Sequence, residues 1–171
     1  MPGDRDPTAL QRVQNDRGFT FGSTRLSFTG HYALLPQDLI LHLSLPVGDL
    51  GTAKAFYVDV LGCRLGRVRE DWIDVWFFGM QLTLQRRPTE VRSVDDQGVR
   101  HFGVALNEQH VFEAVAARLS ASEGVYWITR PTTHQAADMS GKTEIKIADP
   151  SGNVIEIKFY PDVAEYRAVA Q

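Results

Sequence analysis

The chain repeats one order of predicted elements, and this repeat constrains its fold more than any other feature. In the first half, a β-like run at 39–47 precedes an apolar stripe made by Ala53, Phe56, Tyr57 and Val60. The i, i+3, i+4, i+7 spacing of this stripe predicts an amphipathic helix. Three short extended runs follow the helix, at 64–70, 72–78 and 80–86.

The same order returns after a polar linker at 88–98. A strand is predicted at 100–106, and a second helical stripe then follows. Three more strands are predicted near 125–130, 142–148 and 153–159, with a polar loop at 131–141. The repeat of about 60 residues indicates an internal duplication. We therefore expect an α+β fold in which two βαβββ modules form a curled mixed sheet around a shared metal cavity.

These patterns also divide the chain. We expect an N-terminal extension, partly disordered, over 1–37, because this segment is polar and rich in turn residues. The duplicated domain is predicted at 38–160, with modules at 38–87 and 99–160. Residues 161–171 are then a C-terminal tail.

The two modules align residue by residue. The run HLSLPV matches HFGVAL in polarity at every other position, so His42 corresponds to His101. Superposing the glycines of GMQLTL and GNVIEI makes Thr83 correspond to Glu156. Duplicated positions occupy equivalent places in duplicated modules. The alignment therefore predicts that these four residues surround one centre.

The predicted strands explain how these residues could bind a metal ion. Alternate residues of a strand face opposite sides of a sheet, and the apolar ones should pack on the helices. His42, His101 and Glu156 lie on the other faces, which should line a cavity. Two imidazoles and a carboxylate are ligands of Fe(II), Mn(II) and catalytic Zn(II) sites. Thr83 is a poor ligand, so its position is left open for water or substrate.

A single histidine in a strand is more often an ordinary polar residue than a metal ligand. Two histidines at equivalent positions, with a glutamate at the predicted third position, favour the metal site.

The aromatic run that includes Trp72 also has two possible roles. Core packing is favoured for these aromatic residues, although alternate members could stack on an aromatic substrate. The four residues concerned are Trp72, Trp76, Phe77 and Phe78.

Composition excludes several other functions. The formal net charge is −3 without a long run of one sign, which argues against binding to nucleic acid or to an anionic membrane. Cys63 is the only cysteine, so an internal disulfide and a cysteine-rich zinc site are excluded. No apolar run approaches the roughly 20 residues needed to span a bilayer. The N-terminus lacks the order of a signal peptide, so a cytoplasmic location is expected.

Two segments resemble the vicinal oxygen chelate superfamily. HLSLPVGDLGTAKAFYVDVLG is similar to its first-module signature, and IADPSGNVIEIKFY is similar to its closing signature. This superfamily includes glyoxalase I, fosfomycin-resistance proteins and extradiol ring-cleaving dioxygenases. The resemblance covers about 39–160 and implies that Glu156 is a metal ligand. DWIDVWFFGMQLTLQ further resembles a bacterial group of extradiol-type dioxygenases, although Met80 and Gln85 stand where that group often has histidine.

The resemblance implies a metal-dependent oxidoreductase of the extradiol dioxygenase type. Its substrate would be a catechol-like or other small molecule with vicinal oxygens. Fe(II) is the expected metal, with Mn(II), Zn(II) and Ni(II) as alternatives. Proton transfer needs a nearby acid or base, and Tyr126, His134 and Tyr160 are the candidates. Members of this fold commonly form dimers, so a homodimer is expected.

Two other functions remain open. A glyoxalase-type lyase or isomerase would use Zn(II) or Ni(II) to polarise a carbonyl, but Thr83 stands where its carboxylate would be expected. A protein that only binds an aromatic ligand or drug would not need the predicted metal ligands. Metal analysis distinguishes this last possibility from the two enzymes.

Overall fold

The computed structural model describes residues 20–21, 24–25, 39–134 and 141–162. The chain divides into two compact units, Met1–Leu39 and Ile40–Gln171, which are considered separately. In the first unit, β1 (Thr20–Phe21) pairs antiparallel with β2 (Thr24–Arg25). The remainder of the predicted extension lies outside the described residues, as do residues 163–171 of the predicted tail. The predicted domain boundaries stay predictions.

The first module of the second unit follows the predicted order of elements. Its strands are β3 (His42–Val47), β4 (Arg64–Val68), β5 (Trp72–Phe77) and β6 (Met80–Arg86). The helix between β3 and β4 consists of α2 (Leu50–Lys54) and a π-helical segment (Ala55–Val60). The carboxylate of Asp49 accepts a hydrogen bond from the Thr52 amide and caps α2. The sheet order is β3-β6-β5-β4, with β3 parallel to β6.

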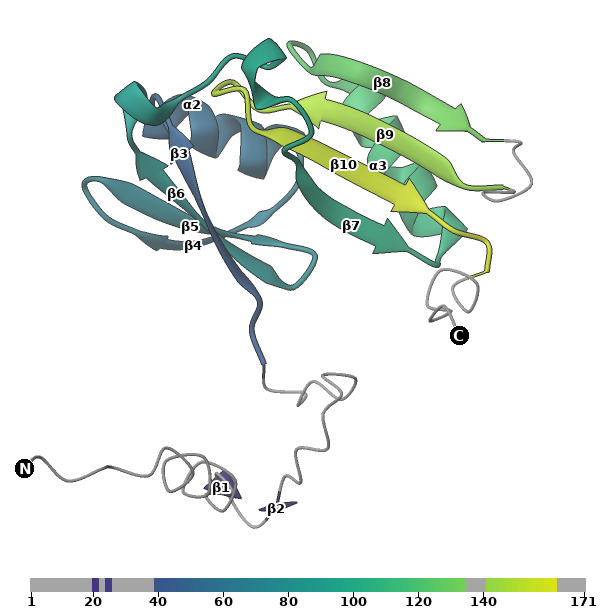
Figure 1. Ribbon diagram of the computed structural model, residues 1–171, viewed down its shortest axis with the longest axis horizontal. Helices are drawn as coiled ribbons and strands as arrows, with labels where there is room; N and C mark the ends of the chain where they lie inside the picture. The colour runs from purple at the N-terminus through teal and green to yellow at the C-terminus, as the bar shows by residue number, and fades with distance from the viewer. Residues whose placement is uncertain (1–19, 22–23, 26–38, 135–140, 163–171) are drawn as a thin grey trace, which may run out of the picture. The chain divides into compact units, whose positions relative to one another are not determined.

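The second module repeats this arrangement after two short 3₁₀ turns, Pro88–Glu90 and Asp95–Gln97. It contains β7 (Phe102–Leu106), α3 (Gln109–Ala121), β8 (Tyr126–Thr133), β9 (Thr143–Ala148) and β10 (Val154–Phe159). Its sheet order is β7-β10-β9-β8 (Figure 1), with β7 parallel to β10. The predicted α+β fold of two βαβββ modules is confirmed. The modules form two separate four-stranded mixed sheets.

Strand register confirms the predicted alignment of the two modules. Ser44 of β3 lies opposite Thr83 of β6, and Gly103 of β7 lies opposite Glu156 of β10. His42 and His101 each stand two residues before these positions. A Cβ atom on Gly103 would overlap the backbone oxygen of Glu156. Glycine therefore permits β7 to approach β10 beside Glu156.

One continuous hydrophobic core packs under both modules. Alternate residues of the inner strands meet the helices there, as the sequence predicted. The fully buried strand residues are Val47, Val75, Leu82, Leu84, Ile145, Ile147, Ile155 and Ile157. Phe77 belongs to this core, whereas Trp72 and Trp76 alternate with its core neighbours and are only half-buried. The favoured core packing is therefore confirmed for Phe77 and was wrong for the two tryptophans and for Phe78, which is 45% exposed.

Polar contacts also join the modules. The Tyr57 hydroxyl donates to the Asp149 carboxylate at 3.0 Å, in the buried interior. Arg118 of α3 donates to the backbone oxygens of Val60 at 2.8 Å and Asp59 at 2.7 Å. These carbonyls end the first helix, where a cation is favourable. The two helical layers are thereby linked.

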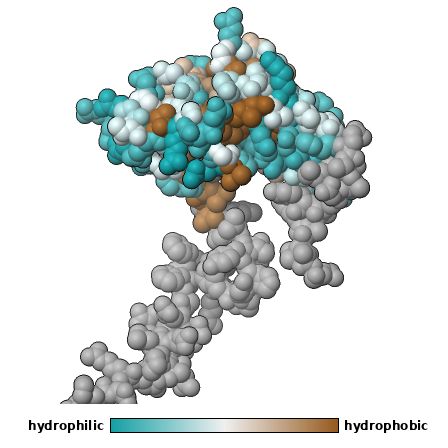
Figure 2. Space-filling view, turned by 45° about the horizontal axis from the view of Figure 1, so that its top comes forward, coloured by the Kyte–Doolittle hydropathy of each residue, from teal (hydrophilic) through white to brown (hydrophobic). Residues whose placement is uncertain are grey.

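The surface of the second unit is mostly hydrophilic in the view of Figure 2, with apolar residues concentrated in a few places. Ile40 and Leu41, which lead into β3, are each 56% exposed. Within the described segments, the helices lack the length and apolar character needed to cross a membrane.

Candidate metal site

The structure brings together His101 and Glu156, two of the three predicted metal ligands. His101 immediately precedes β7, and Glu156 lies in the middle of the adjacent β10. The Nε2 atom of His101 is 3.3 Å from Oε2 of Glu156. This proximity follows from the parallel pairing of β7 and β10, which places the two residues near each other.

The other ring nitrogen determines what His101 offers to this pair. Its Nδ1 lies 2.8 Å from the backbone oxygen of Val99. A carbonyl oxygen only accepts hydrogen bonds, so Nδ1 carries a proton. In the neutral ring, Nε2 then presents a lone pair toward the Glu156 carboxylate. This is the tautomer of a metal-ligating histidine, whose second nitrogen commonly donates to a backbone carbonyl.

His42 stands in the other sheet and has a different partner. Its Nδ1 lies 3.0 Å from Oε1 of Gln81, the residue beside it on β6. Across the described residues, no three histidine, cysteine, aspartate or glutamate side chains form a group able to hold a metal ion. The three-ligand site therefore stays a prediction. A single chain brings two of the three predicted ligands together.

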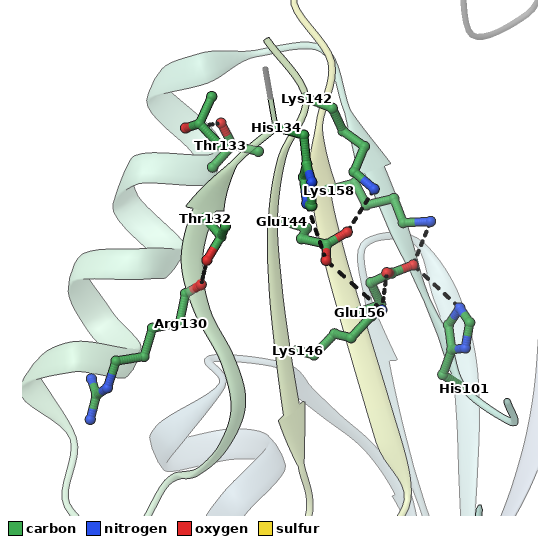
Figure 3. A network of polar contacts seen from close by, with 11 residues as sticks. His101, Arg130, Thr132, Thr133, His134, Lys142, Glu144, Lys146, Glu156 and Lys158 are labelled. Atoms are coloured by element: carbon green, nitrogen blue, oxygen red, sulfur yellow. Dashed lines mark hydrogen bonds and ion pairs between the residues drawn. The ribbon is translucent and has the colours of Figure 1, made fainter. Parts of the chain in front are cut away.

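Two lysines contact the Glu156 carboxylate (Figure 3). Lys158 Nζ is 2.5 Å from Oε2, and Lys146 Nζ is 3.1 Å from Oε1. Burial opposes ionisation of Glu156, but the hydrogen bonds from Lys158 and Lys146 outweigh burial and lower its pKa. Glu156 is therefore a carboxylate at neutral pH, as a metal ligand must be.

The donor chemistry fits two ligands of a divalent ion, namely an ionised carboxylate and an imidazole with a free lone pair. The ammonium groups of Lys146 and Lys158 supply the positive charge that such an ion would otherwise supply. Their side chains are 31% and 25% exposed, so they have room to turn toward solvent. A metal ion would have to displace them from the Glu156 oxygens.

A second carboxylate adjoins this pair on β9. Glu144 forms an ion pair with Lys142 at 2.6 Å, and both side chains are at most 10% exposed. Burial opposes ionisation of Glu144, but the Lys142 and Lys146 ammonium groups outweigh it and lower the pKa. Lys146 Nζ is also 3.9 Å from Glu144, so it links the two carboxylates. The sequence patterns did not single out these residues, although alternation along β9 places Glu144 and Lys146 on one face.

The predicted catalytic residues occupy different places. His134 belongs to the network of Figure 3, with its Nε2 3.4 Å from Oε1 of Glu144. This buried Nε2 has no hydrogen-bond partner in the described part of the chain. Tyr126 instead lines a cavity of about 430 Å³ beside the Asp149 turn. The Tyr160 backbone N–H donates to the oxygen of Leu106 at 2.9 Å.

His101 also lines a cavity of about 340 Å³ to which both modules contribute. Leu43 and Leu45 enter it from β3, and Phe102 and Val154 enter it from the second module. The volume is suited to a small molecule. A small ligand could therefore reach the imidazole of His101 from this side.

Known proteins share this fold. The family model described as "Glyoxalase/Bleomycin resistance protein/Dioxygenase superfamily" matches residues 39–157. No curated protein matches the chain. A solved glyoxalase/bleomycin resistance protein/dioxygenase from Alicyclobacillus acidocaldarius is 29% identical, with a TM-score of 0.68. This match covers 75% of our chain and 96% of that chain.

Two further structures share the fold at lower identity. The lactoylglutathione lyase from Agrobacterium tumefaciens is 22% identical with a TM-score of 0.51, covering 72% of our chain and 95% of that chain. TnmS3, an antibiotic-binding protein from Streptomyces sp. CB03234, is 24% identical with a TM-score of 0.53. That match covers 76% of our chain and 99% of TnmS3. The fold thus occurs in both a named enzyme and a named binding protein.

Proposed function

Because the chain belongs to the glyoxalase/bleomycin resistance protein/dioxygenase superfamily, we propose that it is a metal-dependent enzyme using His42, His101 and Glu156 as ligands. The observation that carries this proposal is the His101–Glu156 pair. The Nε2 atom of His101 lies 3.3 Å from the Glu156 carboxylate, and the Val99 carbonyl accepts a hydrogen bond from Nδ1, which leaves Nε2 to bind a proton or a metal ion. A proton or a metal ion between the two groups would make this contact favourable.

The reaction we propose is an oxidation of the extradiol dioxygenase type, acting on a catechol-like or other vicinal-oxygen small molecule. Bound Fe(II) would supply O2 chemistry and open coordination positions for the substrate oxygens. Lys146 and Lys158 would stabilise an ionised substrate oxygen next to Glu156. His134, beside Glu144, is the best-placed proton-transfer residue, because its Nε2 has no hydrogen-bond partner among the described residues. We do not assign this role to Tyr126, because the cavity that it lines includes neither His101 nor Glu156.

We further propose a homodimer in which His42 comes from the second copy. His42 is exposed and lies on β3, an edge strand of its sheet. β7, the strand that follows His101, is the edge strand of the other sheet. An edge-to-edge arrangement of two copies would bring one copy's β3 to the other's His101–Glu156 pair. This arrangement would explain why one chain assembles two of three ligands.

Metal loading followed by oxygen uptake tests the enzyme. After anaerobic loading with Fe(II), elemental analysis should find about one ion per chain, and catechols should consume O2. His101→Ala and Glu156→Gln should each abolish metal retention. His110→Ala is the matched control, because His110 is an exposed helix residue whose Nδ1 lies 3.7 Å from Glu108. Metal-loaded protein that consumes no O2 with any catechol would contradict the dioxygenase.

Complementation tests the origin of His42. Purified His42→Ala and Glu156→Gln chains should each bind little metal. If the site combines two copies, mixing them should restore one intact site per mixed dimer, because each chain supplies what the other lacks. If the two variant chains form mixed dimers but metal binding is not restored, all the ligands come from one chain.

The alternatives make different predictions. A non-catalytic binder is favoured by one observation, that Lys146 and Lys158 already satisfy the Glu156 carboxylate without a metal. Such a protein would retain no metal, and His42→Ala would leave its ligand binding unchanged. A glyoxalase-type lyase or isomerase would need a further carboxylate. Thr83, at the equivalent position, instead donates to Asp74 at 2.6 Å.

A further inference from the structure

A cavity of about 520 Å³ lies away from the His101–Glu156 pair, between the first module and α3. The first module contributes Trp76 and Phe78, and α3 contributes Val111, Val115 and Arg118. Apolar and aromatic side chains therefore form most of its wall. This volume lies within the range of small-molecule sites, which are mostly apolar with a few polar groups.

Phe78 adopts an unusual backbone conformation at this cavity. It forms the two-residue turn between β5 and β6 with Gly79, with φ of 46° at Phe78 and 84° at Gly79. Asparagine and glycine favour such turns, whereas a bulky residue with positive φ is strained. The Phe78 residue is nevertheless 45% exposed. Strain of this kind is concentrated at functional sites.

One arginine lines the cavity, and a second arginine stacks on the tryptophan of its wall. Arg118 lines it and donates through Nε and Nη2 to two backbone carbonyls, which leaves Nη1 outside those bonds. The Arg64 guanidinium carbon lies 5.2 Å above the Trp76 ring, a cation–π geometry. Among the lining residues that the structure describes, neither aspartate nor glutamate occurs. The site therefore favours an anion.

We propose that this cavity binds a planar aromatic carboxylate. The ligand ring would pack between Trp76 and Phe78. Its carboxylate would accept hydrogen bonds from Arg118, which lines the cavity, and from Arg64, which stacks on Trp76. Arginine suits this role because its planar group binds carboxylates through paired N–H donors. The inference is independent of the proposed metal site, because neither His101 nor Glu156 lines this cavity.

Calorimetric titration of the full chain with 2-naphthoate tests the site. We expect saturable binding of one molecule per chain, unchanged by a chelator. Neutral 2-naphthamide should bind about tenfold more weakly, because it loses the charge-assisted hydrogen bonds. Cyclohexanecarboxylate should also bind more weakly, because it cannot stack. Equal affinity for the acid and the amide, or no saturable binding by folded protein, overturns the proposal.

Three variants locate the binding. Phe78→Asn removes the ring but keeps a residue that tolerates positive φ, so folding is retained, and affinity should fall at least about fivefold. Arg64→Gln, at an exposed position, should have a similar effect. Arg130→Gln is the matched control: Arg130 stacks on Trp127 at 4.7 Å, and Trp127 does not line the cavity, whereas Arg64 stacks on Trp76, which does. Equal losses in Arg64→Gln and Arg130→Gln would contradict the assignment.

Two further measurements distinguish the small-molecule site from the metal site and from a dimer interface. Glu156→Gln should leave 2-naphthoate binding intact even if it abolishes metal retention, so the two proposals fail independently. Sedimentation of the wild type and Phe78→Asn tests whether a second copy occupies the cavity instead. Loss of a dimer in Phe78→Asn would overturn the small-molecule site in favour of that interface.

Discussion

Lys146 and Glu156 lie directly opposite each other on β9 and β10, with Nζ 3.1 Å from Oε1. The equivalent pair in the first sheet is Asp74 and Thr83, joined by a 2.6 Å hydrogen bond. The carboxylate of the pair thus lies on β5 in the first module, as Asp74, and on β10 in the second module, as Glu156. In the first module Arg67 neutralises it at 2.7 Å, and in the second module the lysines do. The duplication has preserved backbone geometry while the side-chain chemistry of the modules has diverged.

Acid should remove the stabilisation that Glu156 contributes. Its folded-state pKa lies below the ordinary value of 4.5, because the Lys158 and Lys146 hydrogen bonds outweigh burial. Its contribution is therefore present above pH 4.5 and is lost as pH falls through the lower folded-state pKa. Urea unfolding with a chelator should show Glu156→Gln less stable than wild type at pH 7. This difference should shrink toward zero in acid, and a constant difference would contradict the prediction.

Glu144→Gln should destabilise the fold even without metal. The substitution leaves the Lys142 ammonium, only 8% exposed, without its carboxylate partner at 2.6 Å. Breaking a buried ion pair from one side costs about 3–5 kcal/mol, and we expect the lower end because the glutamine oxygen can still accept a hydrogen bond from Lys142. Glu108→Gln is the control, because its contact with His110 is exposed and should change stability by less than about 0.5 kcal/mol. Urea unfolding measures both, and equal effects would contradict the prediction.

Tyr57→Phe should weaken the junction between the modules. The lost hydroxyl donates to the Asp149 carboxylate, which also accepts from the Ser151 and Asn153 amides at 2.8 Å. Loss of one buried charge-assisted bond should cost about 1.5–3 kcal/mol. Thermal unfolding followed by circular dichroism checks this value. Tyr126→Phe is the control at an exposed position, and an equal effect there would refute the assigned role of Tyr57.

Phe78→Asn should stabilise the protein by about 0.5–1 kcal/mol, because asparagine tolerates the positive φ that strains phenylalanine. The variant loses an edge-to-face contact with Phe77 at 4.9 Å, which limits the gain. Phe78→Ala is a useful comparison, because it loses the same contact without relieving the backbone strain. Urea unfolding should rank asparagine above phenylalanine and alanine below it. Equal stability of the two variants would contradict the turn argument.

The sequence by itself determined the order of elements and the correspondence of the two modules. Helical spacing at Ala53, Phe56 and Tyr57 and strand alternation near Glu156 are local patterns, so they can be recognised without coordinates. The equivalence of His42 with His101 followed from the repeat alone. Register then confirmed it, because parallel pairing of first and last strands is the same in each module.

Only the tertiary structure decided which side chains meet. His101 reaches Glu156 because β7 pairs with β10, whereas His42 remains beside Gln81 in a separate sheet. The lysine contacts to Glu156 depend on side chains of β9 and β10 sharing one face. The arrangement of the modules depends on contacts between distant residues, such as Tyr57 with Asp149. Periodicity indicates which side of its own strand or helix a residue faces. It does not indicate which side chains from other elements will lie opposite that residue.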